Sequence, residues 1–475
     1  MKTLSKTSLW IGGVLLLILA IGYVTPYGGF AINGPTVSAG VSAQLACAGV
    51  FVSNRPLDDV IKQDVIRLSP LTKWNKYRLD RANGTVTVTA LGLRTRTALY
   101  RPGVGCTLLV DETPERLRAQ AKDIPLPSTE LRPQPWPMGD AVDTERLPAG
   151  IDRAALDKAV EESFTDETPD KAIDTRAIIV VYDGRIVAER YAPGFDRNTR
   201  LLGWSESKSV TAALIGTLVG EGRLHLDALA PIAEWKKPGD PRNAITLRQL
   251  LNMSGGLAFT EPYDPGNDST QMLFQEHDMA RYAAAKPLAH PPGTVWYYSS
   301  GTANILSHIV FEETGGTLVS YESYARSHLF DPAGMTSALF EPDESGNFVG
   351  SSYLYMTARD WARFGLLILD RGTINGHELL PAAFVDFVCT PAPAAPRKQY
   401  GGQFWLNGFS KDNPKEREFP HLPADMCAAE GHNDEFTSVF PSRKVVIVRL
   451  GWTVTDGGFN RDRHYAAILA ALPKS

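Results

Sequence analysis

The chain has 475 residues, of which 43% are hydrophobic and 21% charged, a composition typical of a globular protein with two or three domains. Its formal net charge of -5 at pH 7, without any basic run, gives no reason to expect nucleic acid or an anionic membrane surface as a partner. No periodic repeat occurs, which argues against a repeat architecture.

Residues 1–30 are predicted to be a membrane anchor or a signal peptide. Lys2 and Lys6 precede an uncharged apolar run from Leu9 to Val24, which as a helix spans about 24 Å, near the short limit for crossing a bilayer. Lysines before the run place the N-terminus in the cytoplasm, so we expect export of the rest. No clear cleavage site follows Val24, which favours an anchor in a bacterial inner membrane, facing the periplasm, over release into the periplasm.

Four cysteines suit such an oxidising compartment. Cys47 and Cys106 lie in the N-terminal third, and Cys389 and Cys427 lie near the C-terminus. Pairing within each region is the simplest of the three connectivities, and free buried thiols are the alternative. Because no Cys-x-x-Cys occurs, neither a zinc site of that pattern nor a thioredoxin-type site is indicated. We expect no metal and no organic cofactor.

The segment after the apolar run is predicted to form a small β-rich domain over residues 31–124. Its strand-like signals extend from about Cys47 to Val110, and "RANGTVTVTAL" alternates small and β-branched residues after an Asn-Gly turn pair. Residues 125–148 are dense in proline, which resists helix and sheet, and are predicted to be a semi-rigid linker.

Residues 149–475 are expected to form the main domain. After a first helical pattern, "AIIVVYDGRIVAERYA" predicts a hairpin, and "DEFTSVFPSRKVVIVRLGW" predicts a second one, followed by a closing helix. Hairpins at both ends with helices between them predict an α/β domain in which helices cover one antiparallel sheet. A Gly-rich first turn and repeated strand–helix–strand units, which a Rossmann-type sheet requires, do not occur.

The stretch "GWSESKSVTAALIG", residues 203–216, places two groups for nucleophilic chemistry one turn apart. A helix that starts at Ser205 puts Ser205 and Lys208 on one face. A serine hydroxyl needs a base to remove its proton, and a buried lysine is partly neutral and can be that base. The alternative is an N-cap serine followed by a solvent-facing lysine, but the apolar spacing that follows predicts a buried helix.

Two later stretches add polar groups. In "PPGTVWYYSSGTANIL", Tyr298 and Ser300 lie on a turn at the start of a predicted helix, where a tyrosine can act as general base and acid. The alternative for this tyrosine is a loop anchor packed on the core. In "AAEGHNDEFTSVF", the sequence from His432 leads directly into the penultimate strand, whose backbone N–H groups can complete an oxyanion hole.

In this order, Ser-x-x-Lys, Tyr-Ser-Ser and a polar triplet on a late strand resemble the serine β-lactamase and penicillin-binding protein superfamily. The nearest likeness is to class C β-lactamases and their relatives, among them esterases, D-amino-acid peptidases and 6-aminohexanoate-dimer hydrolase. It covers roughly residue 150 to the C-terminus. The resemblance implies a β-lactamase-like antiparallel sheet flanked by helices, plus a helical subdomain with the site between them. In this chain the small β-rich domain and the N-terminal hydrophobic helix would precede that fold.

The resemblance also implies roles for individual residues. Ser205 would be the acylated nucleophile, Lys208 its partner base and Tyr298 the proton shuttle. The backbone N–H groups of Ser205 and Glu435 would form the oxyanion hole.

Three further residues would contact the substrate. Ser300 would stand where class C enzymes have asparagine, and His432 would stand where they have the lysine of Lys-Thr-Gly, with Asn433 beside it. Asp434 then occupies the position of the glycine. Because the lysine that grips a penicillin carboxylate is missing, antibiotic hydrolysis is disfavoured.

We therefore expect an exported serine hydrolase that cleaves a small-molecule amide or ester through an acyl-enzyme. A D-amino-acid or cell-wall peptidase or a β-lactamase of the same fold is one alternative, and a non-catalytic ligand-binding or sensor domain is another. The loop over residues 255–293 is expected to wall the pocket, with Tyr263, Asp264 or the nearby Trp296 as substrate contacts. The sequence does not indicate an oligomeric state.

Overall fold

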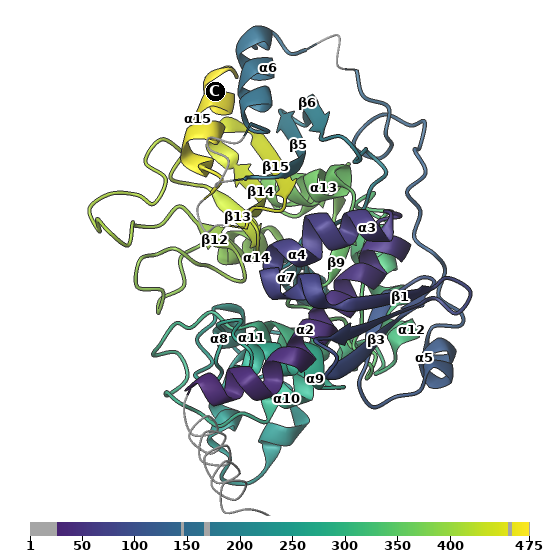
Figure 1. Ribbon diagram of the computed structural model, residues 1–475. Coiled ribbons are helices and arrows are strands. Elements are labelled where there is room, and N and C mark those ends of the chain that lie inside the picture. The colour runs from purple at the N-terminus through teal and green to yellow at the C-terminus, as the bar shows by residue number, and fades with distance from the viewer. Residues whose placement is uncertain (1–25, 144–146, 166–171, 455–457, 475) are drawn as a thin grey trace, which may run out of the picture.

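The computed structural model describes residues 26–143, 147–165, 172–454 and 458–474 (Figure 1). The apolar run from Leu9 to Val24, predicted to be an anchor or a signal peptide, lies outside the described residues. Within the described ranges, no helix combines the length and apolarity that a membrane span requires.

A six-stranded antiparallel sheet forms the centre of the main domain. Both predicted hairpins are present, and the last strand of the sheet in sequence pairs with the first, with Val445 opposite Tyr182. The chain ends of the domain therefore meet in the middle of the sheet. In spatial order the strands are β12 (Trp405–Leu406), β13 (Cys427–Gly431), β14 (Glu435–Phe440), β15 (Val445–Gly451), β5 (Thr175–Tyr182) and β6 (Arg185–Tyr191).

Helices cover both faces of this sheet, which explains why its strands are nearly continuous apolar runs. Helices α6 (Arg153–Glu162) and α15 (Arg461–Ala470) pack on one face, and their apolar residues form one core cluster with alternate residues of the strands. Helices α7 (Glu206–Gly220) and α13 (Ala358–Leu369) pack on the other face (Figure 1). Packing on the sheet therefore places the start of α7 beside the turn between β13 and β14.

A helical part lies beyond α7, and α11 packs against α7 and α10. Its helices are α8 (Leu247–Leu251), α9 (Asp268–Gln275), α10 (Met279–Ala284), α11 (Ser300–Glu313) and α12 (Leu318–Ala325). The remaining elements are α14 (Ala382–Val388), a small sheet of β7 (Leu201–Leu202), β9 (Leu354–Met356) and β8 (Leu339–Phe340), and the pair β10 (Thr373–Ile374) and β11 (His377–Glu378).

The segment before the main domain contains a four-stranded antiparallel sheet and a long helix that the sequence analysis missed. Helix α2 (Pro26–Phe51) packs on this sheet, and its C-terminal half is buried. Helix α2 itself consists of small and apolar residues on all its faces. Its sequence therefore lacks the amphipathic period that predicts a helix. The other elements are α3 (Leu57–Val60), α4 (Ile66–Leu68), β1 (Lys76–Asp80), β2 (Thr85–Ala90), β3 (Arg94–Arg101), β4 (Gly105–Leu109) and α5 (Pro114–Gln120).

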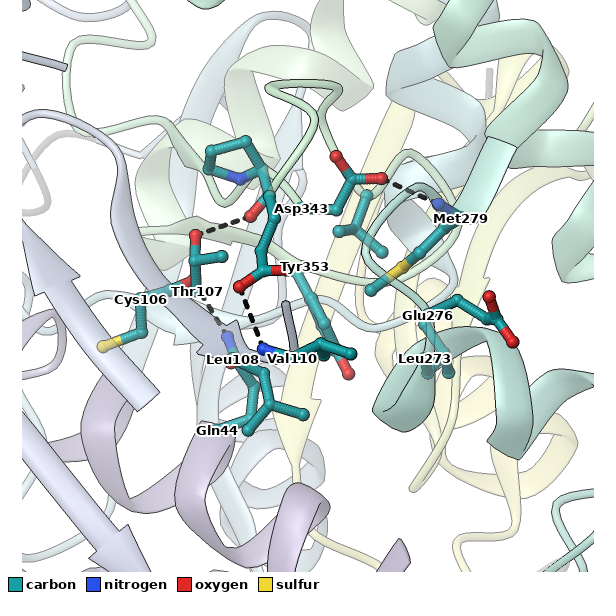
Figure 2. A pocket seen from close by; sticks show the side chains of 13 residues that line it. Gln44, Cys106, Thr107, Leu108, Val110, Leu273, Glu276, Met279, Asp343 and Tyr353 are labelled. Atoms are coloured by element: carbon teal, nitrogen blue, oxygen red, sulfur yellow. Dashed lines mark hydrogen bonds between the residues drawn. The ribbon is translucent and has the colours of Figure 1, made fainter. Parts of the chain in front are cut away.

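This N-terminal segment is bonded directly to the main domain. The Glu341 carboxylate accepts hydrogen bonds from Gln44 Nε2 and from the backbone N–H of Cys106, both at 2.7 Å. The Glu344 carboxylate accepts three backbone N–H groups of residues 110–112. Figure 2 shows the small cavity that remains between the two parts, with a volume of about 10 Å³, room for about one water molecule.

Two disulfides confirm the predicted cysteine pairing. Cys47–Cys106 ties α2 to β4, and Cys389–Cys427 ties the end of α14 to the start of β13.

Candidate active site

Ser205 is the residue immediately before helix α7. A tight turn precedes it, in which Trp204 has a φ of 46° and the Glu206 N–H donates to the Gly203 carbonyl at 2.9 Å. At Gly203 an added Cβ would lie 2.1 Å from the Trp361 ring, so glycine is required for this close approach. The turn holds the Ser205 hydroxyl at the N-terminus of the helix, where the helix dipole places a partial positive charge.

Lys208 lies one turn into the helix and is buried, with 1% of its surface exposed. Its Nζ donates to Ser205 Oγ at 2.8 Å and to the Ser351 carbonyl at 2.8 Å. Burial lowers the pKa of Lys208 to about 8, against the charge of Glu261, which raises it. A large fraction of the amine is therefore neutral near pH 8, the state that a base requires.

Tyr298 completes a group of three side chains. Its ring centroid lies 4.9 Å from Lys208 Nζ, and its hydroxyl is near enough to the Ser205 side chain for the two to interact. The ring also packs on Tyr400 and Trp405, at centroid distances of 5.9 and 5.4 Å. Burial raises the pKa of Tyr298 well above its ordinary value, so its phenol keeps the proton at neutral pH.

The turn that connects β13 and β14 lies beside the start of α7. At Gly431, the last residue of β13, an added Cβ would lie 2.2 Å from the Gly203 carbonyl oxygen. Glu435, the first residue of β14, pairs with Gly431 across the hairpin. The two backbone N–H groups expected to form an oxyanion hole, those of Ser205 and Glu435, therefore belong to segments in direct contact.

The side chain of Asn433 turns away from this contact. Its Nδ2 donates to the Thr453 carbonyl at 2.6 Å, and Arg449 Nη1 donates to the carbonyls of Asn433 and Asp434 at 3.0 and 2.6 Å. Asn433 and Asp434 have φ values of 65° and 61°, a conformation that asparagine and aspartate tolerate better than most residues. Asn433 was expected to contact the substrate, whereas the structure uses its amide to hold the turn.

His432 lies exposed at the tip of the same turn. Its ring is 5.8 Å from Trp204, edge to face, and 6.0 Å from Tyr263. The structure therefore places His432 and Tyr263 together at the mouth of the site, as side chains from two distant parts of the sequence.

Ser300 is fully buried at the start of α11, and its partner is a residue that the sequence analysis did not identify. The Glu261 carboxylate accepts from Ser300 Oγ and from Ser300 N, both at 2.6 Å, and Tyr263 Oη lies 3.4 Å from Ser300 Oγ. No motif marked Glu261, because one acidic residue in a polar loop carries no spacing signal. Tyr263, two residues further along the same loop, is one of the substrate contacts that the sequence predicts.

Other residues around the site were also missed or placed differently. Tyr400 and Trp405 were not identified because they lie about a hundred residues after Tyr298. Trp296 packs with them, 5.5 Å from Tyr400, behind Tyr298. The Asp264 carbonyl accepts from Asn267 N and Thr270 Oγ1 within its own loop.

Behind the nucleophile lies a buried acidic side chain. Glu206, the residue after Ser205, is fully buried; burial raises its pKa well above the ordinary value, and the charge of Glu435 adds to this. Burial also raises the pKa of Glu435, against the charges of Arg176 and Arg449. Both carboxyl groups therefore favour the neutral form, which keeps negative charge away from the two backbone N–H groups.

Comparison with known proteins places this geometry in a family. The sequence profile of the Beta-lactamase family matches residues 156–472. The chain is 25% identical over 287 residues to the 6-aminohexanoate-dimer hydrolase of Paenarthrobacter ureafaciens, an alignment that spans 54% of this chain and 68% of that protein. It is 32% identical over 174 residues to a D-aminopeptidase of Cereibacter sphaeroides, spanning 34% of this chain and 32% of that protein.

A solved structure supports the fold. A penicillin-binding protein homologue from Caulobacter crescentus superposes with a TM-score of 0.51 at 18% identity, covering 69% of this chain and 99% of that chain. The superposition shows that this chain shares the fold of that protein. The chain belongs to the β-lactamase family.

Proposed function

We propose that the protein is a serine hydrolase that cleaves a small-molecule amide or ester through an acyl-enzyme on Ser205. The observation that carries the proposal is the 2.8 Å contact between Lys208 Nζ and Ser205 Oγ, made by an amine that is buried. Side chains of this type in this arrangement are the parts that nucleophilic catalysis needs: a hydroxyl, a base within hydrogen-bond reach and a second proton carrier.

Acylation begins when the neutral amine of Lys208 takes the proton of Ser205 as Oγ forms a bond to the substrate carbonyl carbon. The carbonyl oxygen becomes an oxyanion, which the N–H groups of Ser205 and Glu435 stabilise. The Tyr298 phenol donates its proton to the leaving nitrogen or oxygen as the bond to the carbonyl carbon breaks, and the Lys208 ammonium then returns a proton to the phenolate.

Deacylation repeats these transfers with water as the nucleophile. Lys208, neutral again after acylation, accepts a proton from water while the water oxygen attacks the acyl carbon. Ser205 leaves as the alkoxide and recovers the proton. No part of the cycle requires a group other than the substrate, water and these side chains.

We also propose that the protein acts outside the cytoplasm, anchored in or released from a bacterial inner membrane. Two disulfides favour an oxidising compartment, and lysines before an apolar run favour export.

Covalent labelling tests the function. We expect a fluorophosphonate to add one adduct per chain, detected by intact mass, and the adduct to be lost in Ser205→Ala. Ser209→Ala, on the same helix, is the matched control and keeps the label. Folded protein that stays unlabelled would contradict the proposal and favour a non-catalytic binding domain. A panel of esters, amides, D-alanyl peptides and β-lactams then separates a general amidase from a peptidase or a β-lactamase.

A further inference from the structure

Glu261 is an acidic side chain at the centre of the site whose charge the proposed chemistry does not use. It lies in the loop between α8 and α9, and its carboxylate acts electrostatically on Lys208, Tyr298 and Tyr400. These groups come from three separate parts of the chain. Glu261 is therefore a common electrostatic neighbour of the proposed base, the proposed proton carrier and Tyr400.

The contacts of Glu261 favour its ionised form. It accepts two hydrogen bonds of 2.6 Å from Ser300, one from the hydroxyl and one from the backbone N–H at the start of α11. A helix N-terminus and hydrogen-bond donors both stabilise a negative charge. Burial raises the pKa of Glu261 and so opposes these contacts, while the charge of Lys208 lowers that pKa.

This charge has no dedicated cationic partner. Among the described residues, Lys208 is the one cation that acts electrostatically on Glu261, and Lys208 donates instead to Ser205 and Ser351. When Lys208 is neutral, as the proposed base must be in the reactive form, no other cation among the described residues acts on the Glu261 carboxylate. A partly buried carboxylate without a cation is costly, and a ligand that brings a positive charge reduces that cost.

The mouth of the site also favours a positive ligand. Tyr263, on the same loop as Glu261, exposes 46% of its surface, and its ring lies against that of His432, which in turn lies against Trp204. Aromatic faces attract ammonium groups. The polar triplet that begins at His432 carries histidine where class C enzymes have lysine. It therefore supplies no permanent cation that would bind a substrate carboxylate.

We propose that Glu261 is a specificity-determining residue that binds a protonated amine of the substrate, so that the substrate class is small amides or esters carrying an ammonium group near the scissile bond. This inference rests on the proposed function. Glu261 binds the ammonium by a charge-assisted hydrogen bond, Tyr263 covers it, and a carboxylate at the same place is repelled.

Three anilides with equal acyl length test the proposal: the p-nitroanilides of 4-aminobutanoic, pentanoic and glutaric acid, which end in an ammonium, a methyl and a carboxylate. We expect kcat/KM to fall in that order. In Glu261→Gln, which keeps an acceptor for Ser300, the preference for ammonium over methyl should drop by about 10-fold or more, since a hydrogen bond to a charged group is lost. Glu312→Gln, which removes an exposed carboxylate on α11, should leave the order unchanged.

Labelling of Ser205 separates this inference from the proposed function. Protein that is labelled but prefers the methyl or carboxylate substrate, or cleaves none of the three, overturns the role of Glu261 and leaves the serine hydrolase intact. An unchanged preference for the ammonium substrate in Glu261→Gln would also overturn the proposed role of Glu261. Protein without label and without turnover overturns both proposals.

Discussion

Ser205 and Lys208, the proposed nucleophile and its proposed base, are one helical turn apart, and the surrounding packing gives each its chemical character. Lys208 is an ordinary cation by sequence, but burial lowers its pKa to about 8. Burial has the opposite effect on Tyr298, whose phenol remains protonated. Because burial disfavours whichever form is charged, it favours the neutral amine and the neutral phenol, the forms that the proposed base and the proposed acid require.

This assignment predicts the pH dependence of the reaction. Because the base must be neutral, kcat/KM should rise with pH and level off above about 8, the pKa of Lys208. Lys208→Met should lower kcat/KM by about 10²- to 10⁴-fold and remove this limb of the profile. Lys158→Met, an exposed lysine on α6, is the control. A profile that is flat from pH 6 to 9, or a Lys208→Met variant with full turnover, would rule out the amine as the base.

At the scale of elements, the site depends on how closely three segments approach one another. The start of α7, the start of α11 and the β13–β14 turn come from different parts of the chain. Gly431 allows the first and third to touch, since a Cβ there would overlap the Gly203 carbonyl, whereas the missing Cβ at Gly203 makes room for the Trp361 ring of α13. The hairpin turn is held from behind by Arg449 and Thr453, so its position relative to Ser205 is fixed.

We therefore expect Gly431→Ala to damage catalysis more than stability. The added methyl meets the Gly203 carbonyl and separates β14 from Ser205, which should lower kcat by about 10²- to 10³-fold if one oxyanion-hole donor is displaced. Overpacking should cost about 1–3 kcal/mol of unfolding free energy. Steady-state kinetics and urea denaturation measure the two effects. Unchanged kcat in a destabilised variant would show that the turn does not supply an oxyanion donor.

At the scale of the whole molecule, buried carboxyl groups join the N-terminal segment to the main domain. Glu341 bonds to Gln44 and to the backbone of Cys106, and burial raises its pKa from an ordinary 4.5 to about 8. Burial, with the charge of Asp278, raises the pKa of Asp343 to about 7. Both groups therefore bind protons more tightly in the folded state than in the unfolded state.

The sign of this linkage gives a prediction for stability. Stability from a raised pKa is fully present below the unfolded value of 4.5 and is lost as pH rises through the folded value of about 8. We expect the free energy of unfolding to fall between pH 5 and 8 by an amount on the order of a few kcal/mol. Glu341→Gln should flatten this fall, as measured by urea denaturation at each pH. Stability that rises over this range would contradict the prediction.

Patterns between residues close in sequence were sufficient to predict part of the structure. Turn residues between β-rich runs predicted the two hairpins of the central sheet, and one-turn spacing predicted that Ser205 and Lys208 would meet, because both depend on neighbours along the chain. Cysteine positions were sufficient for the disulfide pairing. The β-lactamase-like fold followed from motif order and agrees with the family match.

The partners and burial of the site residues were decided only by the tertiary structure, because they depend on residues that lie far apart in sequence. The Glu261–Ser300 bond joins residues 39 apart, and the amide of Asn433 is bound by Thr453, 20 residues later. The burial that lowers the pKa of Lys208, and the packing of Tyr400 and Trp405 on Tyr298, arise only when separate segments exclude water together. A sequence specifies which groups are available, but packing determines their charge, their partners and therefore their chemistry.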